Sequence, residues 1–150
     1  MLKKMTISFV IVLCVVFALD RLLLFGLSHN LNIKASYVAQ GKMQADVLVL
    51  GPCEPLFTMD PAYLGRKTPR TYYNLSLNHS DFADNYLHLY LYLQNNAAPQ
   101  LLLLYATPES FDIRFNTFHT YRFVPFLADS TIRTTIADLD PDYATWQYLP

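Results

Sequence analysis

The chain has 150 residues, of which 53% are hydrophobic and 15% are charged, and its formal net charge is -1. This composition is apolar for a water-soluble domain but too polar for a protein with many membrane spans, so it predicts one membrane segment joined to one domain. Because the chain has no basic excess, it lacks the electrostatic basis for a nucleic-acid partner, and we exclude that class.

The N-terminal segment predicts a membrane helix. Residues 5–27 are predominantly apolar and carry no charge apart from Asp20 and Arg21. As a helix they would extend about 34 Å, which is enough for the hydrocarbon core of a bilayer. Lys3 and Lys4 precede the segment, and the positive-inside rule then keeps the N-terminus in the cytoplasm. We therefore expect residues 1–27 to form a cytoplasmic tip and an anchor, with the rest of the chain outside.

Two other interpretations of this segment stay open. The small residues of "VFA", ending at Ala18, suit a cleaved signal peptide, although cleavage would leave the apolar "LDRLLLFGL" at the new N-terminus. A buried core helix is the other. Cys14 falls inside the segment and Cys53 outside it, so the two thiols cannot pair in one chain. Cys53 is therefore predicted to be an unpaired thiol in an oxidising compartment.

The next elements predict the first half of a sheet. Residues 28–44 are expected to be a juxtamembrane helix or linker. The run "VLVLG" at 47–51 is apolar on both faces, which favours a strand covered on both sides in a parallel sheet. Asp60 and Pro61 then suit the start of a helix that Gly65 ends, and a second strand is expected from Thr71.

A helix capped by Ser80 is predicted to follow, ending at residues 95–99. We expect its outward face to carry Asp84 and His88, either solvated or paired with each other four residues apart. Tyr92 and Asn95 share that outward face, and the residues expected to face inward are Phe82, Tyr86, Leu89, Tyr90 and Leu93. Residues 100–106 give the clearest strand, again apolar without alternation.

The last third of the chain has a weaker pattern. Residues 112–130 are aromatic-rich and predict a loop, and Asp129 is expected to cap a helix that buries Ile132, Ile136 and Leu139. Residues 140–142 are expected to start another short helix. The order strand, helix, strand predicts an α/β fold with a parallel sheet and three layers. The helices are too few to cover both faces, so we expect residues 45–150 to be an incomplete domain, either an N-terminal portion or one that a partner completes.

The three predicted strand ends should converge on one crevice, because ligands in open α/β sheets bind outside the carboxyl ends of the strands. These ends are residues 51–54, 74–79 and 107–109. Backbone donors at a strand-to-helix turn favour a thiolate at Cys53, whereas the neighbouring Glu54 disfavours it. Cys53 is thus a nucleophile, a buried turn residue or a thiol for a partner disulfide or oxidation, and the turn residue is the favoured interpretation.

A cysteine nucleophile needs a histidine base, and His79 is the best placed by sequence, at the second strand end. Glu54 and Glu109 either pair across the crevice or are solvated, and solvation is the default. No spacing of ligands predicts a metal, and "LGPCEP" lacks the glycines and lysine of a phosphate-binding loop. We therefore predict neither a cofactor nor a metal.

Three blocks together resemble the SGNH/GDSL hydrolase superfamily, in particular its membrane-anchored bacterial branch of envelope proteins. The blocks are "DVLVLGPCEPLFTMDP", "YYNLSLNHS" and "LLLLYATPESF", after an anchor that ends in "LDRLL". The resemblance implies an SGNH or flavodoxin-like fold, a place in the bacterial inner membrane with the domain in the periplasm, and kinship with esterases or acyltransferases of envelope glycans.

The same resemblance places the family's site on this chain. Its nucleophilic serine falls on Cys53, two residues after Gly51, and its oxyanion donor falls near Ser76 to His79, which includes Asn78. Its third-block asparagine falls near Glu109. The family's Asp-x-x-His has no counterpart before Pro150. We therefore expect a degenerate, non-catalytic protein with the bilayer as partner through residues 5–27 and a glycan or membrane protein as a second partner; the alternative is an active ester hydrolase or O-acyltransferase that uses Cys53.

Overall fold

A parallel sheet of three strands organises the part of the chain outside the N-terminal helix. The computed structural model describes residues 2–29, 34–111, 119–139 and 143. Its strands are β1 (Val47–Leu50), β2 (Tyr72–Asn74) and β3 (Leu101–Leu104), in the order β2-β1-β3. Both pairings are parallel, with Val47 opposite Tyr72 on one side and Leu101 on the other. The predicted α/β class with a parallel sheet is confirmed.

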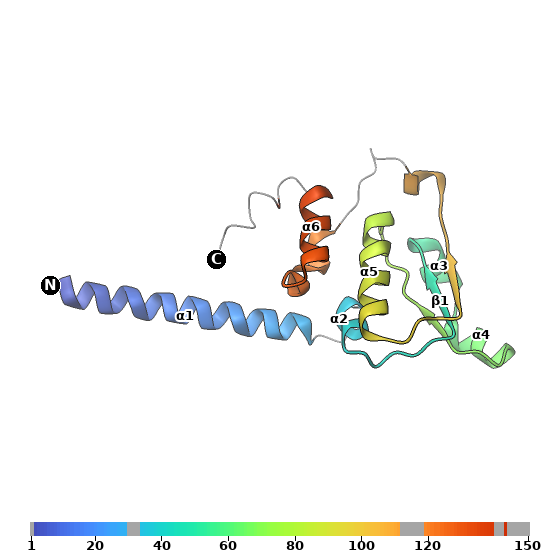
Figure 1. The fold of residues 1–150 in the computed structure, drawn as a ribbon, viewed down its shortest axis with the longest axis horizontal. Coiled ribbons are helices and arrows are strands. Elements are labelled where there is room, and N and C mark those ends of the chain that lie inside the picture. The colour runs from blue at the N-terminus through green and yellow to red at the C-terminus, as the bar shows by residue number, and fades with distance from the viewer. Residues whose placement is uncertain (1, 30–33, 112–118, 140–142, 144–150) are drawn as a thin grey trace.

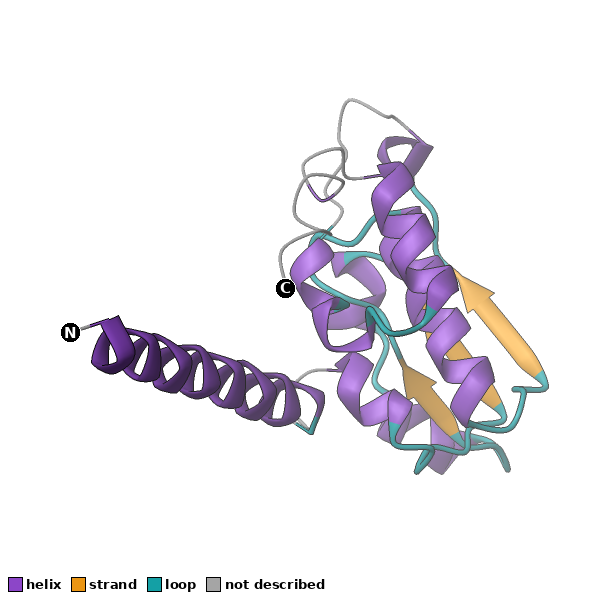
Figure 2. Ribbon diagram, turned by 60° about the vertical axis from the view of Figure 1, so that its left-hand side comes forward, coloured by secondary structure: helices purple, strands orange, loops and turns teal. Residues whose placement is uncertain are grey.

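The helices connect and cover these strands (Figures 1 and 2). They are α1 (Leu2–Ser28), α2 (Lys34–Ala39), α3 (Cys53–Thr58), α4 (Pro61–Lys67), α5 (Phe82–Asn95) and α6 (Ser130–Leu139), with 3-10 turns η1 (Pro108–Phe111), η3 (Thr120–Arg122) and η4 (Val124–Phe126). Figure 1 shows α2, α5 and α6 on one side of the sheet, and α1 extending away from them. Two parallel crossovers of this kind bring the carboxyl ends of all three strands to the same edge.

The hydrophobic core lies between β1 and the helices α2, α5 and α6. All four residues of β1 are at most 1% exposed, which confirms the prediction of a strand covered on both faces. Leu48 and Leu50 point into a cluster with Leu87 of α5, Val38 of α2 and Ile132 of α6. The central strand is thereby fixed in place, and the turn that follows it starts from a rigid support.

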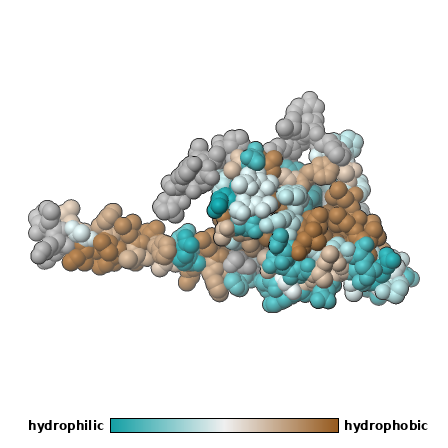
Figure 3. Space-filling model, in the orientation of Figure 1, coloured by the Kyte–Doolittle hydropathy of each residue, from teal (hydrophilic) through white to brown (hydrophobic). Residues whose placement is uncertain are grey.

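The outer strand β3 differs from its prediction. Leu101, Leu102 and Leu104 are 41%, 39% and 50% exposed, although their unbroken apolar sequence indicated burial on both faces. The reason is missing cover: among the described elements β3 packs mainly against β1, so its side chains lack the helices that cover both faces of the central strand. Figure 3 shows the resulting hydrophobic area between α5 and β3. Whether residues 45–150 form an incomplete domain stays a prediction.

The predicted faces of α5 are wrong. Asp84, His88 and Tyr92, expected outside, are at most 1% exposed, whereas Tyr86 and Leu93, expected inside, are 51% and 49% exposed. Leu87 and Leu91 decide the orientation, since they lie on the same side as the three polar residues. Burial of these polar groups is partly offset by interior partners: Oδ2 of Asp84 is ion-paired, Nδ1 of His88 bonds to the Asp84 carbonyl, and the Tyr92 hydroxyl accepts from the amide of Ala45. Asn95 is exposed, as predicted.

The helix starts follow the predicted capping chemistry with two corrections. Asp60 caps α4, since its carboxylate accepts a hydrogen bond of 2.9 Å from the amide of Ala62, but the helix continues past Gly65 to Lys67. Asp81, not Ser80, caps α5 by accepting from the amide of Asp84 at 2.9 Å. The Ser80 hydroxyl instead donates to the carbonyl of Gly51 at 3.0 Å, and so links the second strand end to the first.

The C-terminal part is confirmed where it is described. Asp129 accepts hydrogen bonds from the amides of Thr131 and Ile132, and α6 buries Ile132 and Ile136, whereas Leu139, which was expected to be buried, is half-buried. The predicted aromatic loop contains the two turns η3 and η4 and a fully buried Phe123, and its residues 112–118 lie outside the described residues. The short helix expected at 140–142 also lies outside them.

Helix α1 is the one helix in the described residues that is long and apolar enough to cross a membrane, over Met5–Leu27. None of that segment is buried in the structure, which removes the interpretation as a core helix. Figure 3 shows its hydrophobic surface along most of its length. An anchor and a cleaved signal both fit this observation, and the choice between them stays a prediction.

Candidate functional site

The turn after β1 is built around Gly51. A Cβ atom at this position would lie 2.7 Å from Cγ of Pro55 and 2.9 Å from Cβ of Tyr105, so only glycine fits between α3 and the end of β3. The carbonyl of Gly51 accepts hydrogen bonds from the amide of Leu77 at 3.1 Å and from the hydroxyl of Ser80. These contacts bring the first two strand ends together, as their topology predicted.

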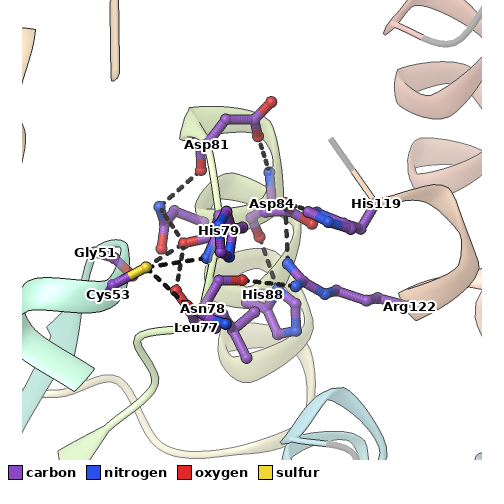
Figure 4. Close-up of polar contacts among 12 residues, drawn as sticks. Gly51, Cys53, Leu77, Asn78, His79, Asp81, Asp84, His88, His119 and Arg122 are labelled. Atoms are coloured by element: carbon purple, nitrogen blue, oxygen red, sulfur yellow. Dashed lines mark hydrogen bonds and ion pairs between the residues drawn. The ribbon is translucent and has the colours of Figure 1, made fainter. Parts of the chain in front are cut away.

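Cys53 begins the short helix α3 and contacts the second strand end through its sulfur. The thiol donates to Oδ1 of Asn78 at 2.8 Å, and Sγ accepts from the backbone N–H of His79 at 3.3 Å (Figure 4). His79 takes a positive φ of 51°, which non-glycine residues adopt rarely. His79 is an exposed residue, and its hydrogen bond to Sγ comes from the backbone and not from the imidazole. The structure thus brings together Gly51, Cys53, Asn78 and His79. His79 takes part through its backbone N–H, whereas its side chain was the predicted base.

Asn74 joins α3 to β2, a role that the sequence did not reveal. Its Nδ2 donates to the carbonyls of Pro55 and Met59 at 2.7 and 3.0 Å, and its Oδ1 accepts from the amide of Ser76. Ser76 itself is 0% exposed, and its hydroxyl has no hydrogen-bond partner in the described residues. Glu109 falls in η1, and its side chain lies outside what the structure describes.

A buried cluster of charges lies next to this turn. Oδ2 of Asp84 is 3.1 Å from Nη1 of Arg122 and 3.3 Å from Nδ1 of His119. The second terminal nitrogen of Arg122, Nη2, donates to the carbonyl of Asn78 at 2.8 Å. Figure 4 shows Asn78 lying between Cys53 and Arg122, so one residue connects the cysteine turn to the charge cluster.

Burial controls the protonation of this cluster. It raises the pKa of Asp84, while Arg122 and His119 beside it oppose that shift. Burial lowers the pKa of His88 to about 4, and this imidazole is therefore neutral at pH 7. Burial also lowers the pKa of Lys34 to about 8; its ammonium group donates to the carbonyls of Asn74 and Ser76.

The predicted pairing of Asp84 with His88 is wrong in detail. Nδ1 of His88 bonds to the backbone carbonyl of Asp84 at 2.8 Å, and the carboxylate turns to Arg122 and His119 instead. Arg122 and Lys34 were not singled out in the sequence, since each is distant from the strand ends along the chain. One sequence signal could have revealed the buried charge cluster. The spacing of Asp84, His88 and Leu91 places the two polar residues on the same helix face as a core leucine.

Among the described residues, no three histidine, cysteine or acidic side chains are grouped so that they could hold a metal ion. The arrangement offers a thiol with two hydrogen-bond partners, and beside it a buried carboxylate that contacts the Arg122 guanidinium and the His119 ring. Comparison of the chain with protein-family models, with characterised proteins and with solved structures finds no match.

Proposed function

We propose that the chain is a single-pass, membrane-anchored, SGNH-like protein of the bacterial cell envelope whose strand-end site binds a ligand without cleaving it. It is related in fold to esterases and acyltransferases that act on envelope glycans. Its partners are the inner-membrane bilayer, which it contacts through residues 5–27, and an envelope glycan or a membrane protein. The parallel sheet, the exposed apolar helix and the position of Cys53 after β1 support this proposal.

The environment of the Cys53 sulfur carries the non-catalytic part of the proposal. The thiol donates its proton to an amide oxygen, Oδ1 of Asn78, which is not a base. Nucleophilic catalysis by cysteine needs a base within hydrogen-bond reach. The predicted base, His79, reaches the sulfur with its backbone N–H, and no hydrogen bond joins its imidazole to the thiol. The imidazoles of His88 and His119 bond to Asp84 instead.

A second candidate function, ester hydrolysis or acyl transfer through Cys53, is favoured by one observation. The backbone N–H of His79 points at Sγ from 3.3 Å. A backbone donor at this place is suited to a thiolate or to a nearby oxyanion. The reactivity of the thiol separates the two candidates.

Thiol labelling tests both the anchor and the site. In a Cys14→Ser background, a membrane-impermeant maleimide is added to spheroplasts, and labelling is followed by mass spectrometry. We expect a reporter cysteine at the exposed Gln94, in the Cys53→Ala variant, to be labelled from outside. Native Cys53 should be labelled more slowly than the same thiol in urea, because it is partly buried and hydrogen-bonded.

The reporter cysteine tests the membrane orientation and native Cys53 tests the reactivity of the site, so each result can contradict the proposal independently of the other. Labelling of the Gln94→Cys reporter only after lysis would contradict the orientation. Labelling of native Cys53 faster than the unfolded chain would show an activated thiol, and the catalytic candidate would then replace the binding one.

A further inference from the structure

The domain outside the N-terminal helix is attached directly to the end of α1. The hydroxyl of Ser36, a residue of α2 that is 0% exposed, donates to the carbonyl of Leu27 at 2.8 Å. The 3-10 turn η4 also contacts α1. Figure 1 shows the orange segment that holds η3 and η4 beside the last turns of this helix. These contacts fix the domain against the end of the helix.

The contact with η4 lies near the outer end of the membrane span. Within Met5–Leu27, Asp20 and Leu24 are half-buried and one helical turn apart, whereas the other residues are exposed. A helix needs about 20 residues to cross the hydrocarbon core, and counted from Met5 these end at Leu24. Asp20 and Arg21 pair at 2.8 Å in the same turns, and charged groups are costly deeper in a bilayer. In a membrane, η4 would therefore lie at the boundary between acyl chains and headgroups.

The surface that η4 presents at this depth is apolar. Val124–Phe126 and the following Leu127 are uncharged and half-buried, so each residue keeps some exposed surface. The nearest charges on either side are used within the protein. Arg122, whose side chain is 12% exposed, pairs with Asp84, and the Asp129 carboxylate accepts hydrogen bonds from the start of α6. No described charge therefore separates the turn from the acyl chains.

Position and composition both indicate lipid as the occupant of this surface. Phenylalanine and leucine form the apolar side of segments that lie in the membrane interface. The backbone groups of a short turn can still bond to water among the headgroups, so the interface accepts a turn that the hydrocarbon core would exclude. Lipid surrounds α1 wherever protein does not cover it, and it reaches η4 without a further partner.

We propose that η4 and Leu127 form a second membrane contact, in which the apolar turn rests in the outer interface of the bilayer beside α1. The inference rests on the proposed membrane anchor and extends it from the helix to the external domain. Because α1 and η4 then both meet the lipid, the domain is held in one orientation relative to the bilayer.

Single-tryptophan variants test the contact through the depth of the indole ring. Trp146, the only tryptophan of the chain, is first replaced by phenylalanine. Phe17→Trp then reports on the anchor, Phe126→Trp on the turn, and Tyr63→Trp on the exposed face of α4, which Figure 1 shows far from α1. The full chain is reconstituted in phosphatidylcholine vesicles whose acyl chains carry bromine near either the glycerol end or the methyl end, and quenching of the fluorescence is measured.

The turn should be quenched from a shallow depth. We expect bromine near the glycerol end to quench Phe126→Trp at least about twice as strongly as Tyr63→Trp, because an interfacial group lies about 15 Å from the bilayer centre and α4 lies in water. Bromine near the methyl end should quench Phe17→Trp more than Phe126→Trp, since Phe17 lies well inside the span. Should Phe126→Trp fail to fold by near-ultraviolet circular dichroism, Val124→Trp reports on the same turn.

The outcomes separate the turn from the anchor. Quenching at the turn no stronger than in Tyr63→Trp, together with strong quenching of Phe17→Trp, would overturn the second contact and leave the anchor intact. An unquenched Phe17→Trp would overturn the anchor, and with it this inference.

Discussion

Replacement of Arg122 by methionine is expected to lower the free energy of unfolding by about 3–5 kcal/mol, the usual cost of removing one partner from a buried ion pair. The side chain of Asp84 is 0% exposed and that of Arg122 is 12% exposed, so water cannot replace the lost guanidinium. His119 would be the remaining partner of the carboxylate, at 3.3 Å and partly exposed. Urea unfolding of the full chain in micelles, followed by near-ultraviolet circular dichroism, measures the change.

The matched controls for Arg122 separate charge from packing. Arg133→Met removes an exposed arginine on α6 and should change the stability by less than about 0.5 kcal/mol. The double variant Asp84→Asn with Arg122→Met should be more stable than Arg122→Met alone, because no buried carboxylate is left uncompensated. A double variant that is less stable than Arg122→Met would contradict the ion-pair account.

The buried His88 should make the protein sensitive to acid. Its pKa is about 4 in the folded chain and 6.5 as the reference value, so the unfolded chain takes up a proton first as the pH falls. This group's contribution to stability is therefore complete above pH 6.5 and is lost between pH 6.5 and 4. The loss is on the order of 3 kcal/mol, at 1.36 kcal/mol per pH unit. Urea midpoints at pH 7 and pH 4.5 report it.

The contribution of His88 is isolated by comparison with a variant that cannot titrate. Asp84, with its raised pKa, opposes the effect, because stability from this carboxylate increases as the pH falls. His88→Asn keeps an amide donor for the Asp84 carbonyl but removes the titration, so its stability should fall less between pH 7 and 4.5. The exposed His79→Asn serves as control and should follow the unmodified chain. Equal pH dependence in all three proteins would show that His88 is not buried as described.

The sheet was predictable because its signals are local. The apolar run at Val47–Leu50 and the Asp60 cap before Pro61 indicate their elements without any tertiary contact. The faces of α5 were not predictable in this way. The helix has aromatic and leucine residues on two sides, and the orientation depends on which side meets Leu48 and Leu50 of β1. A polar residue such as Asp84 then becomes buried only because Arg122, far along the chain, reaches it.

The position of the candidate site was predictable from the sequence, but the roles of its residues were not. Strand topology alone brings Gly51, Cys53 and Asn78 to one edge, and the structure confirms their contact. The role of His79 was not predictable, because its backbone rather than its ring contacts the sulfur. The charges beside the site come from Lys34 and Arg122, which enter from elements that have no strand-end pattern.

The central claim is that Cys53 occupies the place of a nucleophile but does not form a covalent intermediate. The most direct test is incubation of the full chain, in the Cys14→Ser background, with p-nitrophenyl butyrate, followed by peptide mapping by mass spectrometry. We expect no butyryl group on Cys53 above the level found on the urea-unfolded chain. A butyryl-Cys53 adduct that forms faster in the folded chain and disappears with time, and is absent from Cys53→Ala, would contradict it.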